Sequence, residues 1–392
     1  MIQTILYVSL LFTDEISEIY GISDYSLAGN NKKKSIIRSI AQKDTEVHVV
    51  SPVFKTTESN LYCASQSYFD EDIGAHIHIP PIVDLHPVFN YISTTIISTI
   101  YIIHLHMRIN FDSVIFYNFQ LITALPSFIL SKFMNTNLVV QFEDAVYYDT
   151  ESGYLLRISS MLLRKLLNRS LDGAICVNTN LEELIYTDNT VVVRGFPSIN
   201  TDIMDNYNGC TDTITVMFAG RLDELRGIDL FLSSIKCIDE DNIQFWISGY
   251  GPRTDEIKEY IDRLNDDRVS FFGTLPEDEY RKKLVTADIF VNFQKQDEKI
   301  SYYTFPSKLL DYMACEGVIL STNMSDLEKE MNDLVILEDE EYIVDRLSEM
   351  VQKYSRSDNP YDQQIQRAKN WVMFDCTLER QGNKVQTMLA DT

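Results

Sequence analysis

The strongest constraint on the fold is an alternation of short apolar runs with longer amphipathic segments, which occurs twice along the chain. Strands that are buried on both faces and joined by helices are typical of parallel sheets. The pattern predicts two Rossmann-like α/β domains. The expected strands are Thr4–Ser9, Glu46–Ser51, Ser113–Tyr117, Leu138–Phe142, Gly173–Val177 and Thr190–Arg194, and then Thr215–Ala219, Ile243–Ser248, Val269–Phe272, Ile289–Phe293 and Val318–Ser321.

The length and the break in this pattern set the domain boundaries. A chain of 392 residues is long for one core, because single cores stop growing at about 250–300 residues. Residues 198–213 are rich in Asn and Asp and have no periodicity, which indicates a linker. Parallel sheets bind ligands at the carboxyl ends of their strands, so both halves can face one cleft.

The composition excludes several classes of protein. Lys and Arg number 34 and Asp and Glu 58, giving a net charge of −24. Such a field repels phosphate backbones, so we expect no nucleic-acid partner, although a local basic pocket for one small phosphate ligand stays open. The six cysteines have no CxxC spacing and do not cluster with histidine, so we expect no metal site and a reducing compartment.

Four segments bear on membranes. Residues 1–12 lack a basic leader and a cleavage site, so we expect a first strand rather than a signal peptide. Residues 89–107 contain Asn and His residues, which favours a core helix over a membrane span. Basic helices at Lys32–Arg38 and Tyr154–Asn168 are expected to be solvated faces, with anionic lipid as the alternative. We therefore expect a cytoplasmic protein and leave open a peripheral contact at the inner face of the membrane through the first domain.

The turn after the first expected strand of the second half contains two arginines. The segment FAGRL contains Gly220 and Arg221, and Arg226 follows five residues later. The glycine permits a tight turn, and arginine forks match phosphate oxygens. The alternative is that both arginines only pair with Asp223 and Glu224.

Two further turns follow the next strands. Gly249 and Gly251 lie in SGYGP, and Thr274 and Leu275 lie in FFGTLP. Glycine after a strand lets a ligand approach the backbone closely, although a turn without a ligand explains either segment alone. The spacing lacks the GxGxxG fingerprint, which argues against NAD binding.

The fourth segment is FPSK, composed of Phe305, Pro306, Ser307 and Lys308. Proline suits the first turn of a helix, so a helix is expected over residues 305–315. A lysine at a helix start conflicts with the helix dipole, and a bound anion would remove that conflict. Asp311, one turn later, could accept hydrogen bonds from sugar hydroxyls.

In this order after a linker, the four segments resemble the donor-binding domain of GT-B glycosyltransferases, specifically glycosyltransferase family 4. The resemblance is specific over residues 214–325. It implies an acceptor-binding domain at residues 1–197, a linker at 198–213 and a donor-binding domain at 214–365. Helices at 366–392 would return to the first domain, and the two domains would face a central cleft.

The resemblance also assigns donor-binding roles. Arg221 and Arg226 match the basic residues that contact the donor diphosphate, the second being usually Lys. The turn at Thr274 and Leu275 matches the segment that holds the nucleobase through its backbone. The donor-binding set also includes Gly220, Gly249, Gly251, Phe305, Pro306, Ser307 and Lys308.

The family's E-x7-E motif matches this sequence only in part. Its second Glu, a ribose ligand, falls on Asp311, which is one methylene shorter. Its first Glu falls on Tyr303, which is not acidic. Asp297 or Glu298 is the candidate replacement for that carboxylate.

The first half contributes Glu143 and Asp144, at the end of a strand that is expected to point at the cleft. Adjacent carboxylates there could accept a hydrogen bond from an acceptor hydroxyl or stabilise an oxocarbenium-like centre. The alternative is a helix cap or a surface pair. The candidate catalytic residues are therefore Glu143, Asp144, Arg221 and Arg226.

The resemblance thus implies a retaining hexosyltransferase, and we expect it to be metal-independent and to need no cofactor, because Arg221, Arg226 and Lys308 would neutralise the diphosphate. It would move a sugar from a nucleoside-diphosphate sugar to a glycan or lipid-linked acceptor, in cell-surface polysaccharide synthesis. The alternative, motivated by Tyr303, is a catalytically silent GT-B subunit that binds or activates a partner enzyme. A third, weaker hypothesis is a nucleotide-sugar epimerase. The sugar, base, linkage and oligomeric state stay open.

Overall fold

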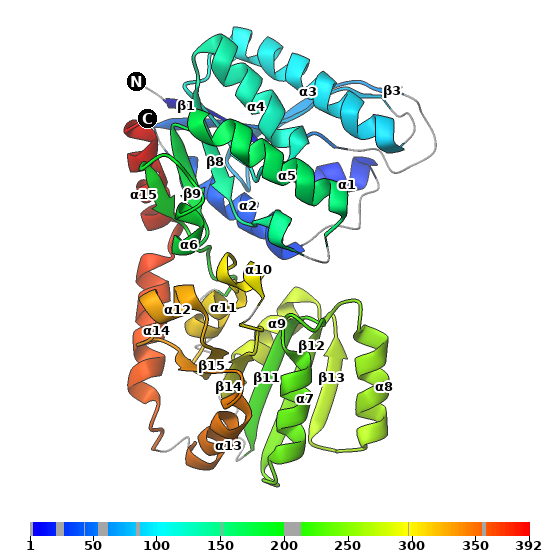
Figure 1. Ribbon diagram of the computed structural model, residues 1–392, viewed down its shortest axis with the longest axis vertical. Coiled ribbons are helices and arrows are strands. Elements are labelled where there is room, and N and C mark those ends of the chain that lie inside the picture. Colours follow the sequence, from blue (N-terminus) through cyan, green and yellow to red (C-terminus); the bar gives the residue numbers. More distant parts are fainter. Residues whose placement is uncertain are drawn as a thin grey trace. The chain divides into compact units, whose positions relative to one another are not determined.

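The computed structural model describes residues 3–20, 27–42, 44–53, 62–83, 87–149, 152–199, 213–296, 298–354 and 358–392 (Figure 1). The chain divides into two compact units, and each is described by itself. The first contains Met1–Gly195 and Leu378–Thr392, and the second contains Phe196–Thr377. Most of the expected linker, including residues 200–212, lies outside the described residues, as does Asp297.

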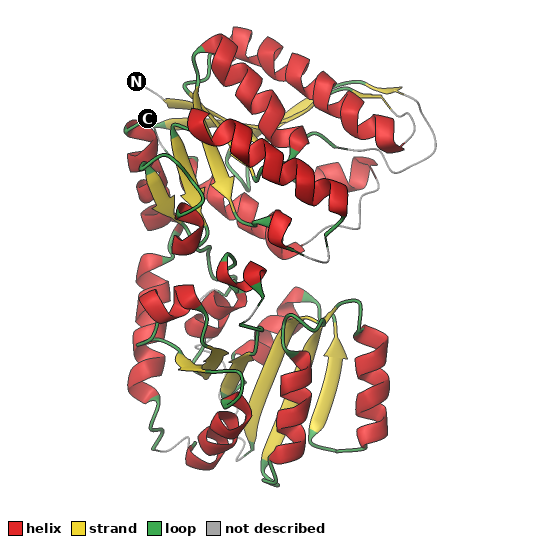
Figure 2. Cartoon of the chain, viewed as in Figure 1, coloured by secondary structure: helices red, strands yellow, loops and turns green. Residues whose placement is uncertain are grey.

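The first unit is built on an eight-stranded sheet in the order β10-β9-β8-β7-β1-β2-β5-β4. Strands are yellow and helices red in Figure 2. All neighbouring strands are parallel except β4 and β5, which form an antiparallel pair at one edge. The strands are β1 Gln3–Val8, β2 Thr45–Val50, β4 Gln66–Asp70, β5 Ala75–Ile79, β7 Ser113–Tyr117, β8 Asn137–Phe142, β9 Gly173–Cys176 and β10 Thr190–Val192, with a separate pair β3 Tyr62–Cys63 and β6 Ile82–Val83.

The helices of this unit are α1 Asp14–Tyr20, α2 Leu27–Ile40, α3 Pro87–Ile109, α4 Leu121–Met134, α5 Tyr154–Leu167, α6 Thr179–Glu182 and α15 Leu378–Ala390. Helix α3 lies beside α4, and α4 beside α5 (Figure 1). Helix α15 packs on α2, where a Cβ on Gly382 would lie 1.9 Å from the Ser39 carbonyl oxygen. The last helix of the chain is therefore part of the first unit.

The second unit contains a six-stranded, fully parallel sheet in the order β13-β12-β11-β14-β15-β16. Its strands are β11 Ile214–Arg221, β12 Ile243–Tyr250, β13 Val269–Gly273, β14 Ile289–Asn292, β15 Val318–Thr322 and β16 Ile336–Glu338. Its helices are α7 Ile228–Cys237, α8 Thr254–Leu264, α9 Glu277–Leu284, α10 Lys299–Tyr302, α11 Lys308–Ala314, α12 Ser325–Glu330, α13 Ile343–Lys353 and α14 Asp362–Asp375.

Both sheets are doubly wound: the chain adds strands on one side of the first strand and later on its other side. In the first unit the reversal falls between β1 and β7, and in the second between β11 and β14. Ligands of such sheets bind outside the carboxyl ends of the strands at this point. Buried aliphatic and aromatic side chains, including Phe218, Phe231 and Phe293, form the core that fixes the second sheet against its helices.

Three local expectations differ from the structure. The antiparallel hairpin β4–β5 was not predicted, because β4 is a largely exposed edge strand without an apolar run. The helix expected from Phe305 begins at Lys308, because Phe305–Ser307 form the turn that leads into it. The chain rejoins the first unit at Leu378 and not at residue 366, since α14 contacts α11 and β15 of the second unit. None of the described helices is long and apolar enough to cross a membrane.

Candidate functional site

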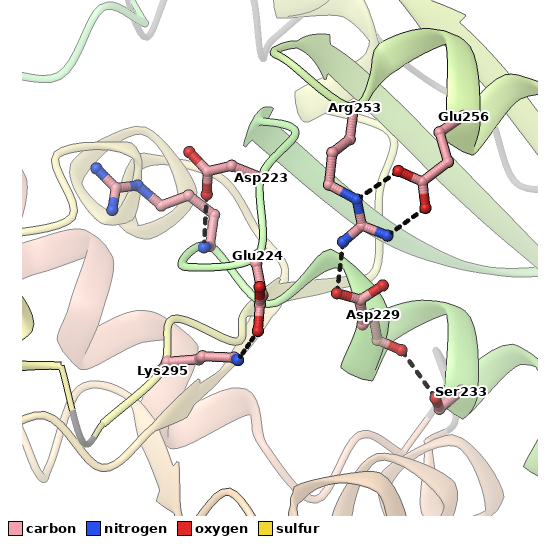
Figure 3. A network of polar contacts seen from close by, with 8 residues as sticks. Asp223, Glu224, Asp229, Ser233, Arg253, Glu256 and Lys295 are labelled. Atoms are coloured by element: carbon pink, nitrogen blue, oxygen red, sulfur yellow. Dashed lines mark hydrogen bonds and ion pairs between the residues drawn. The ribbon is translucent and has the colours of Figure 1, made fainter. Parts of the chain in front are cut away.

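The turn between β11 and α7 is organised by one buried carboxylate, that of Asp223. Its Oδ1 accepts the backbone N–H of Arg226 at 2.8 Å, and its Oδ2 pairs with Arg221 Nε at 2.8 Å. Arg221 therefore does pair with Asp223, as the simpler interpretation expected, but its side chain is still half exposed. Glu224 instead pairs with Lys295, outside the turn (Figure 3).

Lys308 joins this turn from the start of α11. Its Nζ lies 4.9 Å from the centre of the Phe218 ring, and a Cβ on Gly220 would lie 3.7 Å from it. Burial, and then the positive charge of Arg226, lower the pKa of Lys308 from 10.5 to about 7, while Asp223 raises it. Lys308 is thus a cation held where its charge is unfavourable.

Arg226 completes a cluster of three cations around one carboxylate. Its Nη1 is buried and has no hydrogen-bond partner within the part of the chain that the structure describes. Buried polar groups are normally hydrogen-bonded, so an unpartnered guanidinium nitrogen indicates a missing acceptor. The structure brings Gly220, Arg221, Arg226 and Lys308 together at the reversal point of the sheet, and the excess positive charge suits an anion.

The glycines that follow the strands have packing roles of their own. Gly249 has φ 148°, and a Cβ there would lie 1.7 Å from the Gly220 carbonyl oxygen. A Cβ on Gly251 would lie 2.5 Å from the carbonyl oxygen of Leu222. Gly227, which the sequence did not single out as a site residue, has φ 75° and would bring a Cβ to 1.7 Å from the Phe293 carbonyl oxygen. These glycines let the ends of β11, β12 and β14 converge.

The loop after β13 is more open. Ser248 Oγ donates a hydrogen bond to the Gly273 carbonyl oxygen at 3.1 Å, which ties the end of this strand to β12. A Cβ on Gly273 would meet no atom within 4 Å. Thr274 is exposed and Leu275 half-buried, so the backbone of the turn is accessible to a ligand.

Asp311 on α11 faces a different set of partners from Lys308. Its Oδ1 accepts the backbone N–H of Ser198 at 2.6 Å and the Ser198 hydroxyl at 2.9 Å. Burial raises the pKa of Asp311, while these hydrogen bonds and the charge of Arg281 on α9 lower it. Asp311 thus lies on the α9 side of the site. Ser198 was missed because the sequence places it at the edge of the linker.

Position 303, where a second acidic residue was expected, holds a buried tyrosine. The Tyr303 ring packs edge-on against Tyr302, with centroids 4.9 Å apart. Gln294 and Ser301 are both buried in this segment, and Gln294 Nε2 donates to the hydroxyls of Ser301 and Thr304 at 3.1 Å each. Neutral hydrogen bonds therefore contribute to the organisation of the segment before FPSK.

A group of ion pairs centred on Arg253, which we call the outer clamp, lies near this edge of the sheet. Arg253, before α8, pairs with Asp229 of α7 at 2.6 Å and with Glu256 of α8 at 2.7 Å (Figure 3). Hydrogen bonds to Glu256 and Asp229 raise the pKa of Arg253 further above its already high value. Asp229 and Glu256 compensate the charge of Arg253, so we expect this residue to stabilise the local structure and not to bind a ligand.

The carboxyl end of β8 in the first unit carries a second polar cluster, centred on the buried Glu143. Tyr7 donates its hydroxyl proton to Gln141 Oε1 at 2.5 Å, and Gln141 Nε2 donates to Glu143 Oε1 at 2.8 Å. Glu143 Oε2 pairs with Lys32. Asn118 Oδ1 accepts the backbone N–H groups of Glu143 and Asp144 at 2.8 and 3.2 Å.

The two adjacent carboxylates therefore have different environments. Glu143 is buried in a hydrogen-bonded chain, whereas the Asp144 side chain is exposed. Their partners Asn118, Gln141 and Lys32 were not identified from the sequence, because they come from three separate elements. The two acidic residues belong to the first unit and the cation cluster to the second, and each site stands by itself.

Three cations of the basic helix α2 have partners within the first unit, so the helix is more than the solvated face expected for Lys32–Arg38. Lys32 pairs with Glu143, and the buried Lys33 donates to the Leu10 carbonyl oxygen. Burial lowers the pKa of Lys33 to about 8, which the charge of Glu143 partly opposes. Arg38 pairs with Asp72. Lys32, Lys33 and Arg38 therefore each have a partner within the first unit.

The chain is similar to known proteins in its fold and, over part of its length, in its sequence. Residues 213–353 match the family model described as "Glycosyl transferases group 1". Sucrose-phosphate synthase from Thermosynechococcus elongatus superposes with a TM-score of 0.71 at 13% identity, covering 99% of this chain and 98% of that one. Anabaena HepE, solved in complex with UDP, superposes with a TM-score of 0.66 at 12% identity over 100% of both chains. The chain has the GT-B fold. The match to the group 1 family model lies within its second unit.

A curated relative is similar in sequence. It is one of the subunits of phosphatidylinositol N-acetylglucosaminyltransferase from Arabidopsis thaliana, and it is 27% identical over 198 residues, which is 46% of this chain. The match spans 42% of the length of that relative.

Proposed function

We propose that the chain is a retaining glycosyltransferase of the hexosyltransferase type, which moves a sugar from a nucleoside-diphosphate sugar to a hydroxyl group. The observation that carries the proposal is the cation cluster of Arg221, Arg226 and Lys308. A buried guanidinium nitrogen without a partner in the described chain and a lysine with a lowered pKa are both stabilised when a diphosphate arrives.

In this proposal the three cations also stabilise the departing diphosphate. Charge that develops on a leaving group is stabilised strongly by cations that are already in place. We therefore propose a metal-independent reaction without a cofactor. Retention would follow from departure and attack on the same face of the sugar.

The nucleobase and ribose would lie between the β13 turn and α11. The accessible backbone at Thr274 and Leu275 suits hydrogen bonds to a base, and Asp311 Oδ2 is the oxygen that Ser198 does not use. Gly220, Gly249, Gly251 and the segment Phe305–Ser307 would shape the floor of the site. UDP is the first candidate donor nucleotide, because a GT-B neighbour was solved with it.

On the acceptor side, we propose that Glu143 positions the acceptor hydroxyl and that Asp144 contributes from the surface. The acceptor would be a glycan or a lipid-linked saccharide, as in cell-surface polysaccharide synthesis at the cytoplasmic face of a membrane. The name of the Arabidopsis relative supports a lipid-linked acceptor and N-acetylglucosamine as a donor sugar to try first.

The test begins with thermal shifts of the full chain in UDP, GDP, ADP, CMP and dTDP, with and without EDTA. We expect one diphosphate to raise the melting temperature, unchanged by EDTA. Transfer from that nucleotide's labelled sugars then follows, with the variant Arg221→Ala. Near-normal turnover by Arg221→Ala, or activity that EDTA removes, would contradict the proposed role of the cations.

The second candidate is a catalytically silent subunit that binds or activates a partner transferase. Tyr303 favours it, because this position carries no carboxylate. The Arabidopsis relative is itself named as one subunit of an enzyme, which supports a protein partner. Binding of UDP without transfer or hydrolysis of any labelled nucleotide sugar would favour this candidate, and turnover by the isolated chain would exclude it.

A further inference from the structure

Helix α3 of the first unit exposes apolar side chains and buries polar ones over part of its length. Ile92, Ile96 and Ile100 recur at a spacing of four and are exposed, Ile96 by 55% and Ile100 by 64%. Thr95 and Ser98 are buried beneath them. Helices of globular proteins place apolar residues inward, so this arrangement indicates that the outer side of α3 contacts something apolar.

Helix α5 shows the same exposure. Leucines that recur on one side of this helix are exposed: Leu155 is 81% and Leu166 72% exposed, and Leu162 is half exposed. The residues that α5 does bury include Leu163 and Leu167, one position further on. Between the two helices, α4 adds the exposed Phe133. Helix α4 contacts both α3 and α5, so the three helices present one continuous face (Figure 1).

The charge of this face is opposite to that of the chain. The chain carries a net charge of −24, yet α3, α4 and α5 contain no Asp or Glu. Together they contain five basic residues: Arg108, Lys132, Arg157, Arg164 and Lys165. We call the outer surface of α3, α4 and α5 the α3–α5 face.

The exposed cations lie directly beside exposed apolar side chains. Arg108 follows Met107 at the end of α3, Lys132 precedes Phe133 on α4, and Lys165 precedes Leu166 on α5; all six are exposed. Nearby acidic residues are used elsewhere: Asp112 and Asp172 accept the backbone N–H groups of Thr4 and Leu138. Apolar side chains flanked by cations are the arrangement with which helices lie in the surface of an anionic bilayer.

We propose that the α3–α5 face docks the first unit onto a lipid bilayer that contains anionic lipids. A second copy of the chain fits less well, because a symmetric contact would bring the same cations against each other. The proposal does not depend on sugar transfer, and it holds equally for a catalytically silent chain. It places membrane contact on a different surface from α2, where Lys32 and Lys33 have partners within the first unit.

The experiment is flotation of the full chain with vesicles of phosphatidylcholine, alone or with phosphatidylglycerol added. We expect cofloating with the anionic vesicles, weakened when salt rises from about 0.05 M to about 0.5 M. The double variant Leu155→Glu with Leu166→Glu should lower the bound fraction at least about tenfold, and Lys132→Glu with Lys165→Glu should do so for anionic vesicles.

The control is Phe374→Glu, which changes an exposed apolar residue (64%) on α14 of the second unit and should float like the unchanged chain. Circular dichroism melts establish that the variants fold. Failure of the unchanged chain to float, equal binding to both vesicle types, or normal floating of the leucine variant would overturn the proposal. A dimer in light scattering that the leucine variant dissociates, without flotation, would identify a second copy as the occupant instead.

Discussion

The carboxyl edges of the two sheets use charge in opposite ways. At the edge of the second unit, Arg226 keeps a buried nitrogen without a partner in the described chain, and Lys308 has a lowered pKa. At the edge of the first unit, Lys32 pairs with Glu143, and Lys33 donates to a carbonyl oxygen. The same architecture thus provides one edge suited to an anion and one whose charges are already compensated.

From this difference we propose separate tasks for the two edges. A cluster with excess positive charge binds a diphosphate tightly, whereas a compensated pair suits a neutral hydroxyl that must be oriented. If the comparison is correct, substitutions in the second unit should change nucleotide affinity. Substitutions in the first unit should change transfer and leave nucleotide affinity alone.

The largest effect is expected from Arg226→Ala. Removing a preorganised donor to developing charge typically lowers kcat by about 100–1000-fold, and we expect a loss of that size in kcat/KM. Calorimetric UDP affinity should fall with it. The control is Arg253→Ala on the outer clamp, which should leave UDP affinity within about twofold, because Arg253 is compensated by Asp229 and Glu256. Equal losses in both variants would mean that the cluster has no special role.

The next effect is expected from Lys308→Met, which should weaken UDP binding by about 100-fold near neutral pH. The pKa of Lys308 is about 7 without a ligand, and a bound anion raises it, so binding takes up a proton above pH 7. The affinity of the unchanged chain should therefore fall as pH rises above 7, by at most about tenfold per unit. The variant should lose this dependence, and a slope that persists in Lys308→Met would assign it to another group.

Lys308 should also lower the stability of the ligand-free chain. Its pKa is lower in the folded state than in the unfolded state, so the cost is full below pH 7 and fades as pH approaches 10.5. At about pH 6, Lys308→Met should raise the melting temperature by about 2–4 °C, the shift that about 1 kcal/mol produces. No rise would mean that the ammonium is better solvated than the fold indicates.

A smaller effect is expected from Glu143→Gln, which keeps the shape of the side chain but removes the charge opposite Lys32. Transfer should fall about tenfold or more, while calorimetric UDP affinity stays the same. Asp144→Asn is the control, and its effect should be weaker because that side chain is exposed. A loss of UDP affinity in Glu143→Gln would break the division between the two edges.

The smallest effect is expected from Asp311→Asn, with a loss of about three- to tenfold in UDP affinity. Because the proposed partner is ribose, binding of uridine should fall by the same factor, whereas Arg226→Ala should affect UDP far more than uridine. Ser198→Ala keeps the carboxylate and should cost less than Asp311→Asn. If uridine binds Asp311→Asn normally, Asp311 has only a structural role.

The sequence by itself determined the fold class. The two series of apolar runs correspond to the strands of two doubly wound sheets, because strands buried on both faces need continuous apolar segments. It also identified Arg221, Arg226 and Lys308 as candidates, since a cation after a strand or at a helix start needs a local reason. The edge hairpin β4–β5 left no such signal, because an exposed strand has no apolar run.

Only the tertiary structure decided what each charge is for. Lys32 and Lys33 look like a surface helix in sequence, but the fold buries them against Glu143 and Leu10, residues far away along the chain. Leu155, Leu162 and Leu166 of α5 have the spacing of a core stripe in sequence, but the helix buries Leu163 and Leu167 instead, so the stripe is exposed. Periodicity shows that a helix has two sides. Which side is covered depends on the neighbours that folding brings, and these lie outside any local window of sequence.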